Sequence, residues 1–553
     1  MTRLHKSWWP FHLYLWAVVL VLVLVLLPAC HCHIPNTTAG DLNLTLGLGL
    51  GPKLSSGADI YLRGSVEYDR LARRYTDLDR PTFAAIVAVA STRDVVETIQ
   101  YARNHHIPFL AQSGGHALPG SVVVPAAGGL IQINLRRLNE VQFDPTGTFA
   151  TVGGGVLMDE FINATHRNGR VTTVGSSPCT GVMGVTLGGG LGRLQGLYGY
   201  MIDNVVQLTV VLYDGGIRTV SPHENRDLWW GMRGAGQQFG VVTQAVIRTH
   251  PQQNDGMHFV ADMEFESTAA AQVFAAVNRI ATPALPSRLA VTIISQYQGD
   301  GEPSLLLVNF VWSGPRESSL EYLRVFQELD PFSSNESSVP WDVLPWVTYR
   351  ALNRMICDNP GGQKNSYSAS LAAFNPSAMA ALVHDWEARN RHPTARGRVR
   401  FSLMMQTFSN TTTSTAVSRR AAEEGEEEDA FPWRNKLNHL ISLQAQYTDE
   451  SLRTEVDDLL QATRDRLVGE GRLQQYVNLG HGVRDPVEAL YGNERARLHR
   501  LRALKTRYDP EGWFDLYQPL RRPARLDQSL GLGQEDMVTQ DRQEGEKWSH
   551  DDL

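Results

Sequence analysis

Cysteine is scarce in this chain. Only four occur among 553 residues, and two of them, Cys30 and Cys32, lie close to the N-terminus. Cys179 and Cys357 remain in the body of the chain, so a small scaffold built on many disulfides is excluded. The sequence leaves open whether these two cysteines pair or stay as free thiols, because pairing depends on their distance in the fold.

A long basic block is also absent. The formal net charge is −7, and basic and acidic residues are mixed along the chain. Proteins that bind nucleic acid cluster Lys and Arg to neutralise phosphates, so we expect no nucleic-acid partner. The one acidic run, at residues 421–429, is interpreted as a solvated loop.

The two glycine-rich stretches match neither common nucleotide-binding motif. Gly188–Gly192 lacks the third glycine and the following acidic residue of a Rossmann site, and no phosphate loop with Lys and Ser or Thr occurs. Backbone without Cβ atoms can still approach a pyrophosphate closely and offer it N–H donors. Ser113–His116 is the second such stretch, and Gly181 and Gly184 precede the first.

The N-terminus predicts export. Arg3 and Lys6 precede an unbroken apolar run at residues 13–27, and small residues follow at Ala29 and Cys30. The run suits a signal-peptide core and is short for a membrane span, so we expect cleavage near its end. A retained signal-anchor and a bacterial lipoprotein box are the alternatives. Five glycosylation sequons support the secretory route; they are Asn36, Asn43, Asn163, Asn335 and Asn410.

Hydrophobic periodicity predicts an α+β chain. A helix is expected at residues 92–104, where apolar residues recur at helical spacing. Strands are expected at 84–90, 108–111, 130–135, 149–152, 205–212 and 217–220. Beyond residue 253, alternating strands at 289–295, 305–312 and 399–405 are separated by helices such as 269–280, which favours an antiparallel sheet with helices on one face.

Four motifs then occur in a specific order. They are Gln112–His116, Gly181–Asn204, Asp227–Thr243, and a closing segment with Tyr476-Val477-Asn478 and Tyr508-Asp509-Pro510. Together they resemble the FAD-binding domain of the vanillyl-alcohol oxidase and p-cresol methylhydroxylase family. The chain resembles more closely the berberine bridge enzyme-like FAD-linked oxidases of fungal secondary metabolism. Any one of these motifs would be weak evidence for the family, whereas the four motifs in this order are specific for it.

The resemblance implies an α+β fold with two domains. A p-cresol methylhydroxylase-type FAD-binding domain of two α+β subdomains would enclose a substrate domain, whose antiparallel sheet is covered by helices. The expected boundaries are 1–30 for the signal peptide, 31–59 for a flexible linker, 60–252 for the FAD-binding domain, 253–475 for the substrate domain, 476–525 for the return to the FAD-binding domain, and 526–553 for a disordered tail.

The resemblance also implies a covalent flavin on His116, bonded at the 8α-methyl carbon. Many relatives add a second bond from a cysteine, but that position is Ser177 here, so a single attachment is expected. Cys179, two residues later, is expected to be a buried packing cysteine, with a link to flavin as the alternative. The other residues expected to bind FAD are Ser113, Gly114, Gly115, Gly181, Gly184, Val242 and Asn478.

The family's usual catalytic groups are missing. Leu479 stands where many relatives carry a tyrosine, and the strand after Phe431-Pro432-Trp433-Arg434 has no carboxylate. The catalytic base therefore stays unassigned. The candidates are Tyr476, His439, Gln444 and His481, and each is open to a structural role as well.

The implied activity is hydride abstraction from a small secondary metabolite to flavin N5, followed by reoxidation by dioxygen. Leu479 and Leu440 replace polar groups, which favours an oxygenated, largely apolar substrate over a sugar, because each unpaired hydroxyl costs about 1–3 kcal/mol. The alternatives are a secreted carbohydrate oxidase and a flavin-binding protein with little turnover. We expect no metal, and no membrane partner unless the N-terminal segment is retained.

Overall fold

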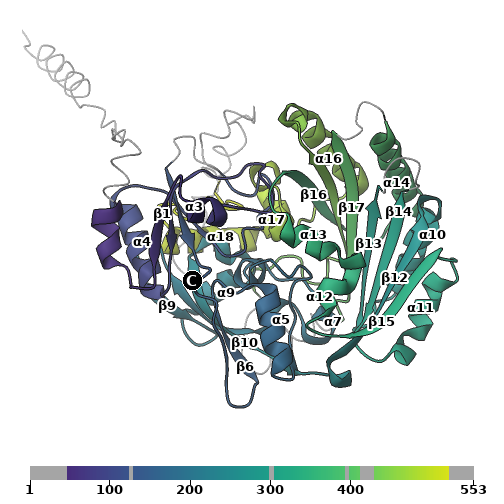
Figure 1. The fold of residues 1–553 in the computed structure, drawn as a ribbon, viewed down its shortest axis with the longest axis horizontal. Coiled ribbons are helices and arrows are strands. Elements are labelled where there is room, and N and C mark those ends of the chain that lie inside the picture. Colours follow the sequence, from purple (N-terminus) through teal and green to yellow (C-terminus); the bar gives the residue numbers. More distant parts are fainter. Residues whose placement is uncertain (1–45, 124–128, 298–303, 393–397, 412–428, 522–553) are drawn as a thin grey trace, which may run out of the picture. The chain divides into compact units, whose positions relative to one another are not determined.

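The structure is a computed structural model that describes residues 46–123, 129–297, 304–392, 398–411 and 429–521. The predicted signal peptide, Asn36, Asn43, residues 421–428 and the predicted tail lie outside these ranges. Figure 1 shows a mixture of helices and sheets, with the largest sheet antiparallel, which confirms the predicted fold class. Within the described ranges, no helix is long and apolar enough to cross a membrane.

The first sheet has four strands in the order β1-β2-β4-β3. Their bounds are β1 Asp59–Leu62, β2 Phe83–Ala88, β4 Leu130–Asn134 and β3 Phe109–Gln112. Strand β4 runs parallel to both β2 and β3. Parallel strands need a crossover connection, and helix α4 (Thr92–Asn104) supplies it between β2 and β3. Its N-cap is Ser91, whose hydroxyl accepts a hydrogen bond from the Asp94 N–H at 3.2 Å.

The second sheet has five antiparallel strands in the order β5-β6-β10-β8-β9. Their bounds are β5 Val141–Phe143, β6 Phe149–Gly153, β10 Val241–Arg248, β8 Val205–Val211 and β9 Ile217–Val220, and β7 Arg170–Val171 pairs separately with β11 His250–Pro251. The helices of this region are α3 Val66–Leu71, α5 Met158–Arg167, α6 Val182–Thr186, α7 Gln195–Tyr198, α8 Met201–Asn204 and α9 Arg226–Ala235.

The third sheet, called the large sheet below, has seven antiparallel strands in the order β15-β12-β14-β13-β17-β18-β16. Their bounds are β15 Ser333–Pro340, β12 Met257–Glu266, β14 Leu305–Trp312, β13 Leu289–Gln296, β17 Val399–Phe408, β18 His439–Tyr447 and β16 Gln363–Leu371. Helices α10 Ala270–Ile280, α11 Leu320–Gln327, α14 Pro376–Arg391 and α16 Arg453–Val468 cover one face (Figure 1).

Side-chain alternation decides which face of the large sheet packs against the helices. In β17, Leu403 and Met405 are buried in the core shared with the helices, whereas Ser402, Met404 and Gln406 point the other way and are half-buried. Because the period of a strand is two, one face is apolar and sealed, and the other carries polar groups. The second face is therefore free to form the wall of a site.

Two short segments differ from their sequence-based predictions. Residues 46–50, expected within a flexible linker, form a helical turn in which Leu46 and Leu50 are fully buried. Their spacing puts both leucines on one side of that turn, so they bury together. Asp429, expected in a solvated loop, is buried and pairs with Arg434, whose guanidinium also bonds Asp203 at 2.6 Å.

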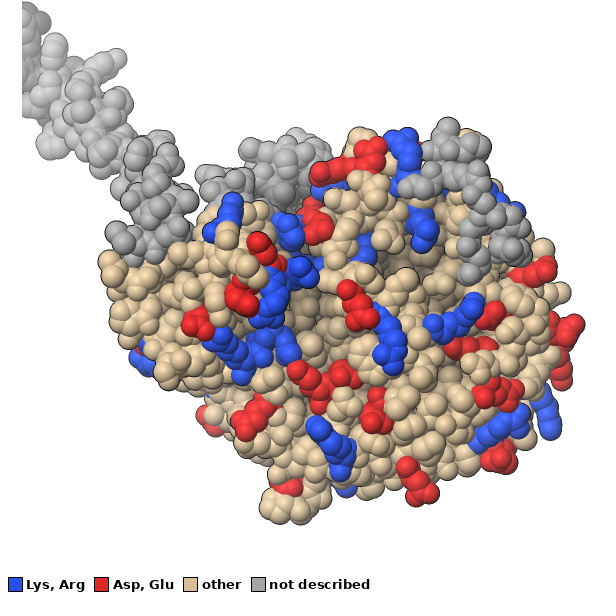
Figure 2. Space-filling model, viewed as in Figure 1, with Lys and Arg blue, Asp and Glu red and all other residues tan. Residues whose placement is uncertain are grey.

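Figure 2 shows one face of the molecule with basic and acidic side chains interspersed. This distribution agrees with the mixed charge pattern of the sequence, because no broad field of one sign forms on this face.

The C-terminal segment (residues 476–521) returns to the two smaller sheets. It contains helices α17 Val487–Tyr491 and α18 Arg495–Tyr508. Lys505 is fully buried, and its Nζ lies 2.8 Å from an Asp509 oxygen and 2.7 Å from an Asp515 oxygen. It also donates to the Gln238 carbonyl at 2.9 Å, so one buried ammonium fastens this segment to the loop before β10.

We predict that Lys505→Met lowers the free energy of unfolding by about 3–5 kcal/mol, because it leaves two carboxylates without their buried cation. Arg507→Met is the matched control: its exposed pair with Asp227 should contribute less than about 1 kcal/mol. Denaturant unfolding followed by tryptophan fluorescence measures both. Equal effects of the two substitutions would contradict the assignment.

Candidate active site

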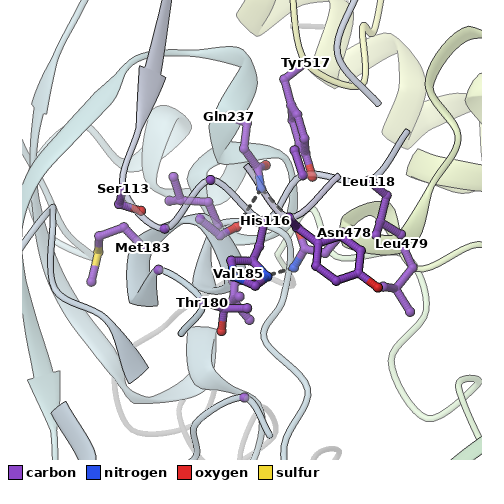
Figure 3. A pocket seen from close by; sticks show the side chains of 18 of the residues that line it. Ser113, His116, Leu118, Thr180, Met183, Val185, Gln237, Asn478, Leu479 and Tyr517 are labelled. Atoms are coloured by element: carbon purple, nitrogen blue, oxygen red, sulfur yellow. Dashed lines mark hydrogen bonds between the residues drawn. The ribbon is translucent and has the colours of Figure 1, made fainter. Parts of the chain in front are cut away.

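A cavity of about 430 Å³ opens between the two smaller sheets and the polar face of the large sheet. Its walls come from residues 109–118, 175–187, 237–242, 349–356, 404–408, 440–444, 476–479 and 513–517. Segments from both ends of the chain therefore meet around one space. Figure 3 shows side chains from these segments converging on it.

Every residue predicted to bind FAD lines this cavity. These residues are His116, Ser113, Gly114, Gly115, Gly181, Gly184, Val242 and Asn478. They lie far apart in the sequence, so their convergence is a property of the fold. Ser177, Leu440 and Leu479 line the same cavity.

The glycines of this wall serve two different purposes. A Cβ atom on Gly114 would lie 2.7 Å from the Gly181 nitrogen, so Gly114 lets two loops touch backbone to backbone. A Cβ atom on Gly181 would collide in turn with the Ser113 hydroxyl. At Gly184 a Cβ atom would meet nothing within 4 Å, so the backbone there faces open space.

The triple glycine Gly188–Gly190 does not line the cavity, contrary to the expectation that this stretch approaches a pyrophosphate. All three residues are buried against side chains instead. A Cβ atom on Gly189 would lie 2.7 Å from the Phe431 ring, and Cβ atoms on its neighbours would collide with Asn478 and Met201. Gly189 and Gly190 also have φ values of +118° and +77°, which other residues rarely adopt.

His116 faces the cavity with its ring nitrogens free of hydrogen bonds to any described residue. The imidazole stacks on Tyr75 with 5.4 Å between ring centroids. Burial, followed by the positive charges of Lys364 and Arg74, lowers the pKa of His116 to about 4. The ring is therefore neutral above that pH, and a nitrogen lone pair is available to an electrophile in the cavity.

Tyr476 organises the wall rather than acting as a base. Its hydroxyl oxygen accepts from the N–H groups of Gly190 and Leu191 at 3.1 and 3.3 Å, and from Asn478 Nδ2 at 2.7 Å. Burial raises the pKa of Tyr476 above its ordinary value. A phenol oxygen that already holds three donors is poorly placed to take a proton from a substrate.

Neither candidate histidine reaches the cavity. His439 lies on the helix-covered face of β18, where Nδ1 bonds Thr407 Oγ1 at 2.8 Å and burial lowers its pKa to about 4. His481 stacks on Tyr367 with 4.1 Å between centroids, and its pKa is lowered mainly by burial. Both are therefore structural. Of the four candidates, only Tyr476 and Gln444 line the cavity.

The large sheet contributes an uncharged wall. Ser366, Met404, Gln406, Leu440, Ser442 and Gln444 face the cavity from β16, β17 and β18. The Ser366 and Ser442 hydroxyls bond each other at 2.8 Å, whereas the Gln406 amide bonds no described residue. Gln406 was not among the residues predicted from the sequence, although the period-two pattern of its strand could have indicated it.

Tyr349 lines the cavity beside this wall and packs against Met404 of β17. Arg193 Nη2 donates to its hydroxyl at 2.7 Å. Tyr349, Arg350 and Ala351 have φ values of +60°, +53° and +59°, so three successive residues adopt the left-handed region. The Arg350 N–H donates to Asp262 Oδ2 at 2.8 Å, which helps to hold this unfavourable backbone. No local pattern in the sequence predicts a left-handed turn at these residues.

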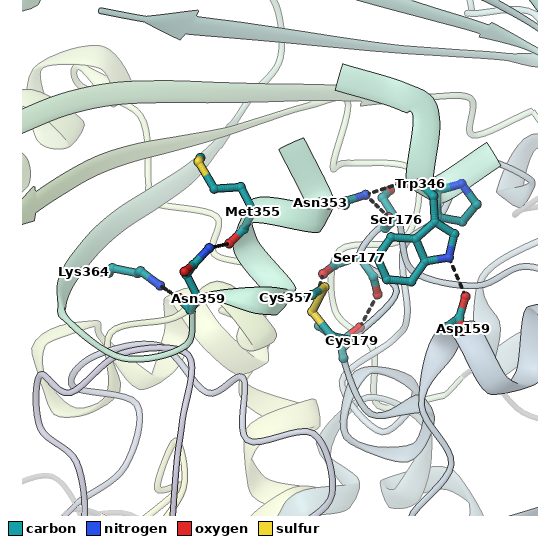
Figure 4. The surroundings of a disulfide bond; sticks show 12 residues. Asp159, Ser176, Ser177, Cys179, Trp346, Asn353, Met355, Cys357, Asn359 and Lys364 are labelled. Atoms are coloured by element: carbon teal, nitrogen blue, oxygen red, sulfur yellow. Dashed lines mark hydrogen bonds between the residues drawn. A yellow bond between two sulfur atoms is a disulfide. The ribbon is translucent and has the colours of Figure 1, made fainter. Parts of the chain in front are cut away.

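A disulfide joins Cys179 to Cys357 and settles the question that the sequence left open (Figure 4). It ties the loop before α6 to helix α13 (Leu352–Asp358), which supplies Asn353 and Ile356 to the cavity. Asn353 Nδ2 adds a hydrogen bond to the Ser176 carbonyl at 3.1 Å. Cys179 is thus not the free packing cysteine that was expected, and its sulfur is not free to bond a flavin.

Metal ligands are not grouped in the described ranges: no set of three or more His, Cys, Asp or Glu side chains is placed to hold an ion.

Comparisons with known proteins agree with this geometry. Residues 83–221 match the model of the FAD binding domain. FAD-linked oxidoreductase alt4 from Alternaria solani is 35% identical over 493 residues, which cover 85% of this chain and 95% of that protein.

Solved structures share the fold. The carbohydrate oxidase from Microdochium nivale superposes with a TM-score of 0.70 at 22% identity, covering 86% of this chain and 99% of that one. The glucooligosaccharide oxidase from Acremonium strictum gives 0.67 at 18% identity, covering 87% and 100%. With a relative at 35% identity over 85% of its length, the chain belongs to the family of FAD-linked oxidoreductases.

Proposed function

We propose that FAD occupies the cavity and is attached covalently to His116 alone. The main support is the neutral imidazole of His116, which faces the cavity with both ring nitrogens free of hydrogen bonds to described residues. It lies in the same cavity wall as Gly114, Gly115 and Gly181. The solved glucooligosaccharide oxidase is described as carrying a 6-S-cysteinyl, 8α-N1-histidyl FAD, so both bonds occur on this fold. Here Ser177 offers a hydroxyl and Cys179 is held in a disulfide, which supports a single attachment.

The proposed reaction is oxidation of a substrate C–H bond. When bound, FAD supplies an acceptor for the hydride and passes two electrons to dioxygen, which yields hydrogen peroxide. The chain's own residues hold the substrate and exclude water. The proton that the substrate loses during oxidation still needs an acceptor. The Leu479 side chain cannot act as a base. The Tyr476 hydroxyl oxygen already accepts three hydrogen bonds. We therefore favour substrates whose own acidic hydroxyl releases the proton.

The proposed substrate is a neutral, oxygenated ring compound. Leu440, Leu479, Met404 and Phe408 give the cavity an apolar surface that suits an aromatic or polyketide-like ring. Gln406 and its polar neighbours can bond a few oxygen atoms of such a ring. A charged ligand would meet no counter-charge on the large-sheet wall and would lose its hydration.

A carbohydrate substrate is the second candidate. The amides and hydroxyls of the large-sheet wall favour it, because a buried sugar needs many hydrogen-bond partners. Solved structures described as carbohydrate, chitooligosaccharide and xylooligosaccharide oxidases share the fold. The apolar side chains of Leu440 and Leu479 are unfavourable for a carbohydrate. Measured turnover on both substrate classes distinguishes the carbohydrate from the neutral ring compound.

Export to the secretory route is also proposed. A disulfide is typical of proteins that fold in an oxidising compartment. Among the described sequons, Asn335 is exposed on the edge strand β15. Asn410 differs, since its Oδ1 accepts from Gln195 Nε2 at 2.9 Å inside the fold. Asn335 is therefore a better glycosylation site than Asn410.

The covalent flavin gives the first test. Acid-precipitated wild-type protein should stay yellow and fluoresce as a single band on a denaturing gel, because the C–N bond survives unfolding. His116→Ala should release all of its flavin on unfolding. Asn335→Gln is the matched control and should change only the glycan. Complete loss of flavin from the wild-type protein would refute the attachment, and a flavopeptide containing residues 177–179 would refute the single bond.

The open space at Gly184 provides the second test, which asks whether the flavin binds against this part of the backbone. We predict that Gly184→Leu lowers flavin occupancy about tenfold while the melting temperature of the flavin-free protein changes little, because its side chain enters the cavity without striking protein atoms. Gly114→Val should instead fail to fold, since its Cβ meets backbone. Absorbance at 450 nm and thermal unfolding measure the two effects. Full flavin loading of Gly184→Leu would place the cofactor elsewhere.

Substrate choice gives the third test. Peroxide release should be efficient with neutral phenolic or polyketide-like alcohols and poor with cello-oligosaccharides. Gln406→Ala should lower kcat/KM about tenfold, the loss expected for one buried hydrogen bond. Gln446→Ala is the control, because Gln446 is exposed at the end of β18 and lies outside the cavity. Efficient oxidation of cellobiose would reverse the ranking of the two candidates.

A further inference from the structure

Lys364 reaches from the large sheet to the segment that supports His116. It lies at the start of β16, and its Nζ donates to the Asn359 carbonyl at 2.8 Å (Figure 4). The same Nζ donates to the Tyr75 carbonyl at 3.1 Å. The backbone is fastened too: Lys364 N–H donates to Thr76 Oγ1 at 3.1 Å, and that hydroxyl donates to the Lys364 carbonyl at 2.9 Å. The position of this ammonium is therefore fixed.

Tyr75 connects this lysine to the histidine. Lys364 Nζ lies 4.8 Å from the centroid of the Tyr75 ring, and the His116 ring stacks on the same tyrosine at 5.4 Å. The Tyr75 N–H donates to the Gly115 carbonyl at 3.0 Å, which sets the backbone just before His116. Lys364 and His116 thus lie against one aromatic ring.

The charges around His116 all have one sign. Lys364 and the buried Arg74, which bonds Gln112 Oε1 at 2.7 Å, are the charged groups that act on the imidazole in the described ranges. Tyr75 is neutral, since burial raises its pKa. Asp77 is the carboxylate that acts on Lys364: it accepts from the Gly362 N–H at 2.6 Å and pairs with Arg80 at 2.9 Å.

We propose that Lys364 is a positioning residue for covalent flavin attachment, and that its charge keeps His116 in the neutral, nucleophilic form under acidic conditions. This inference rests on the proposed attachment of FAD to His116. A protonated imidazole has no free lone pair for bond formation, and a nearby cation disfavours that protonated form.

Attachment forms one bond, between a His116 nitrogen and the 8α carbon of the flavin. One C–H bond of the methyl group and the N–H bond of the imidazole break. The two protons and two electrons released reduce the isoalloxazine ring, and dioxygen then accepts them as hydrogen peroxide. The step needs a neutral ring at the outset, and the Lys364 charge adds to burial in maintaining that condition.

The test measures attachment rather than turnover. Full-length protein is produced in a riboflavin-starved host, mixed with FAD and dioxygen at pH 5 and pH 8, and sampled for flavin that survives denaturation. Wild type should attach flavin at similar rates at both pH values. Lys364→Met should slow attachment at pH 5 about threefold and Lys364→Glu about tenfold, because each raises the pKa of His116, and both should recover at pH 8.

Two controls separate charge from structure. Lys364→Arg keeps the positive charge and should behave like wild type. Lys436→Met removes an exposed lysine outside the cavity and should have no effect. Equal slowing of Lys364→Met at both pH values, or wild-type rates at pH 5, would overturn the proposal for Lys364. Failure of the wild type to attach flavin at either pH would overturn the proposed function itself.

Discussion

The backbone at Gly188–Gly190 has no room for a single Cβ atom, and the walls of the cavity are arranged around that constraint. Phe431, Met201 and Asn478 press on these glycines from three separate segments of the chain. The Tyr476 hydroxyl then bonds the N–H groups at the end of the same turn. Because these contacts are mutual, they hold the C-terminal segment and the loop before strand β18 at fixed distances from helix α6, which contains Gly184 and begins after Gly181.

A buried charge network reinforces this arrangement. Arg434 bonds Asp203 and Asp429, and all three side chains are largely withdrawn from water. Such a network contributes little net stability when intact, but losing one member leaves an uncompensated charge. It therefore favours one arrangement of the Phe431 segment over others. Several residues that mark the family in the sequence, such as Asp203 and Arg434, thus hold the cavity in shape, and the chemistry proposed above needs from them only that shape.

Local patterns predicted local structure well. The helix at 92–104 and the strands at 217–220 and 305–312 were predicted with their observed bounds, because their apolar residues repeat with the period of the element. Ordered motifs predicted which residues meet at the cavity. Asp429 was misread because a charge run says nothing about a distant partner such as Arg434.

The remaining misreadings have the same cause. His439 and Gln444 lie on one strand but on opposite faces, and only the assembled sheet shows which face the cavity takes. Tyr349 sits in a left-handed turn stabilised by Arg193 and Asp262, which the sequence places far away. The identity of the motif residues could suggest the cofactor. Which other side chains line the cavity depends on contacts between segments that are distant in the sequence.

The return of the C-terminal segment has a consequence for the timing of biogenesis. Trp513, Phe514 and Tyr517 form part of the cavity wall, and Lys505 fastens them in place. These residues are among the last of the described chain to leave the ribosome. The strands of the large sheet all precede this segment in the chain, whereas the cavity wall is incomplete until residues 513–517 have been synthesised. A cofactor held in this cavity can therefore be enclosed only after residues 513–517 have been synthesised and packed.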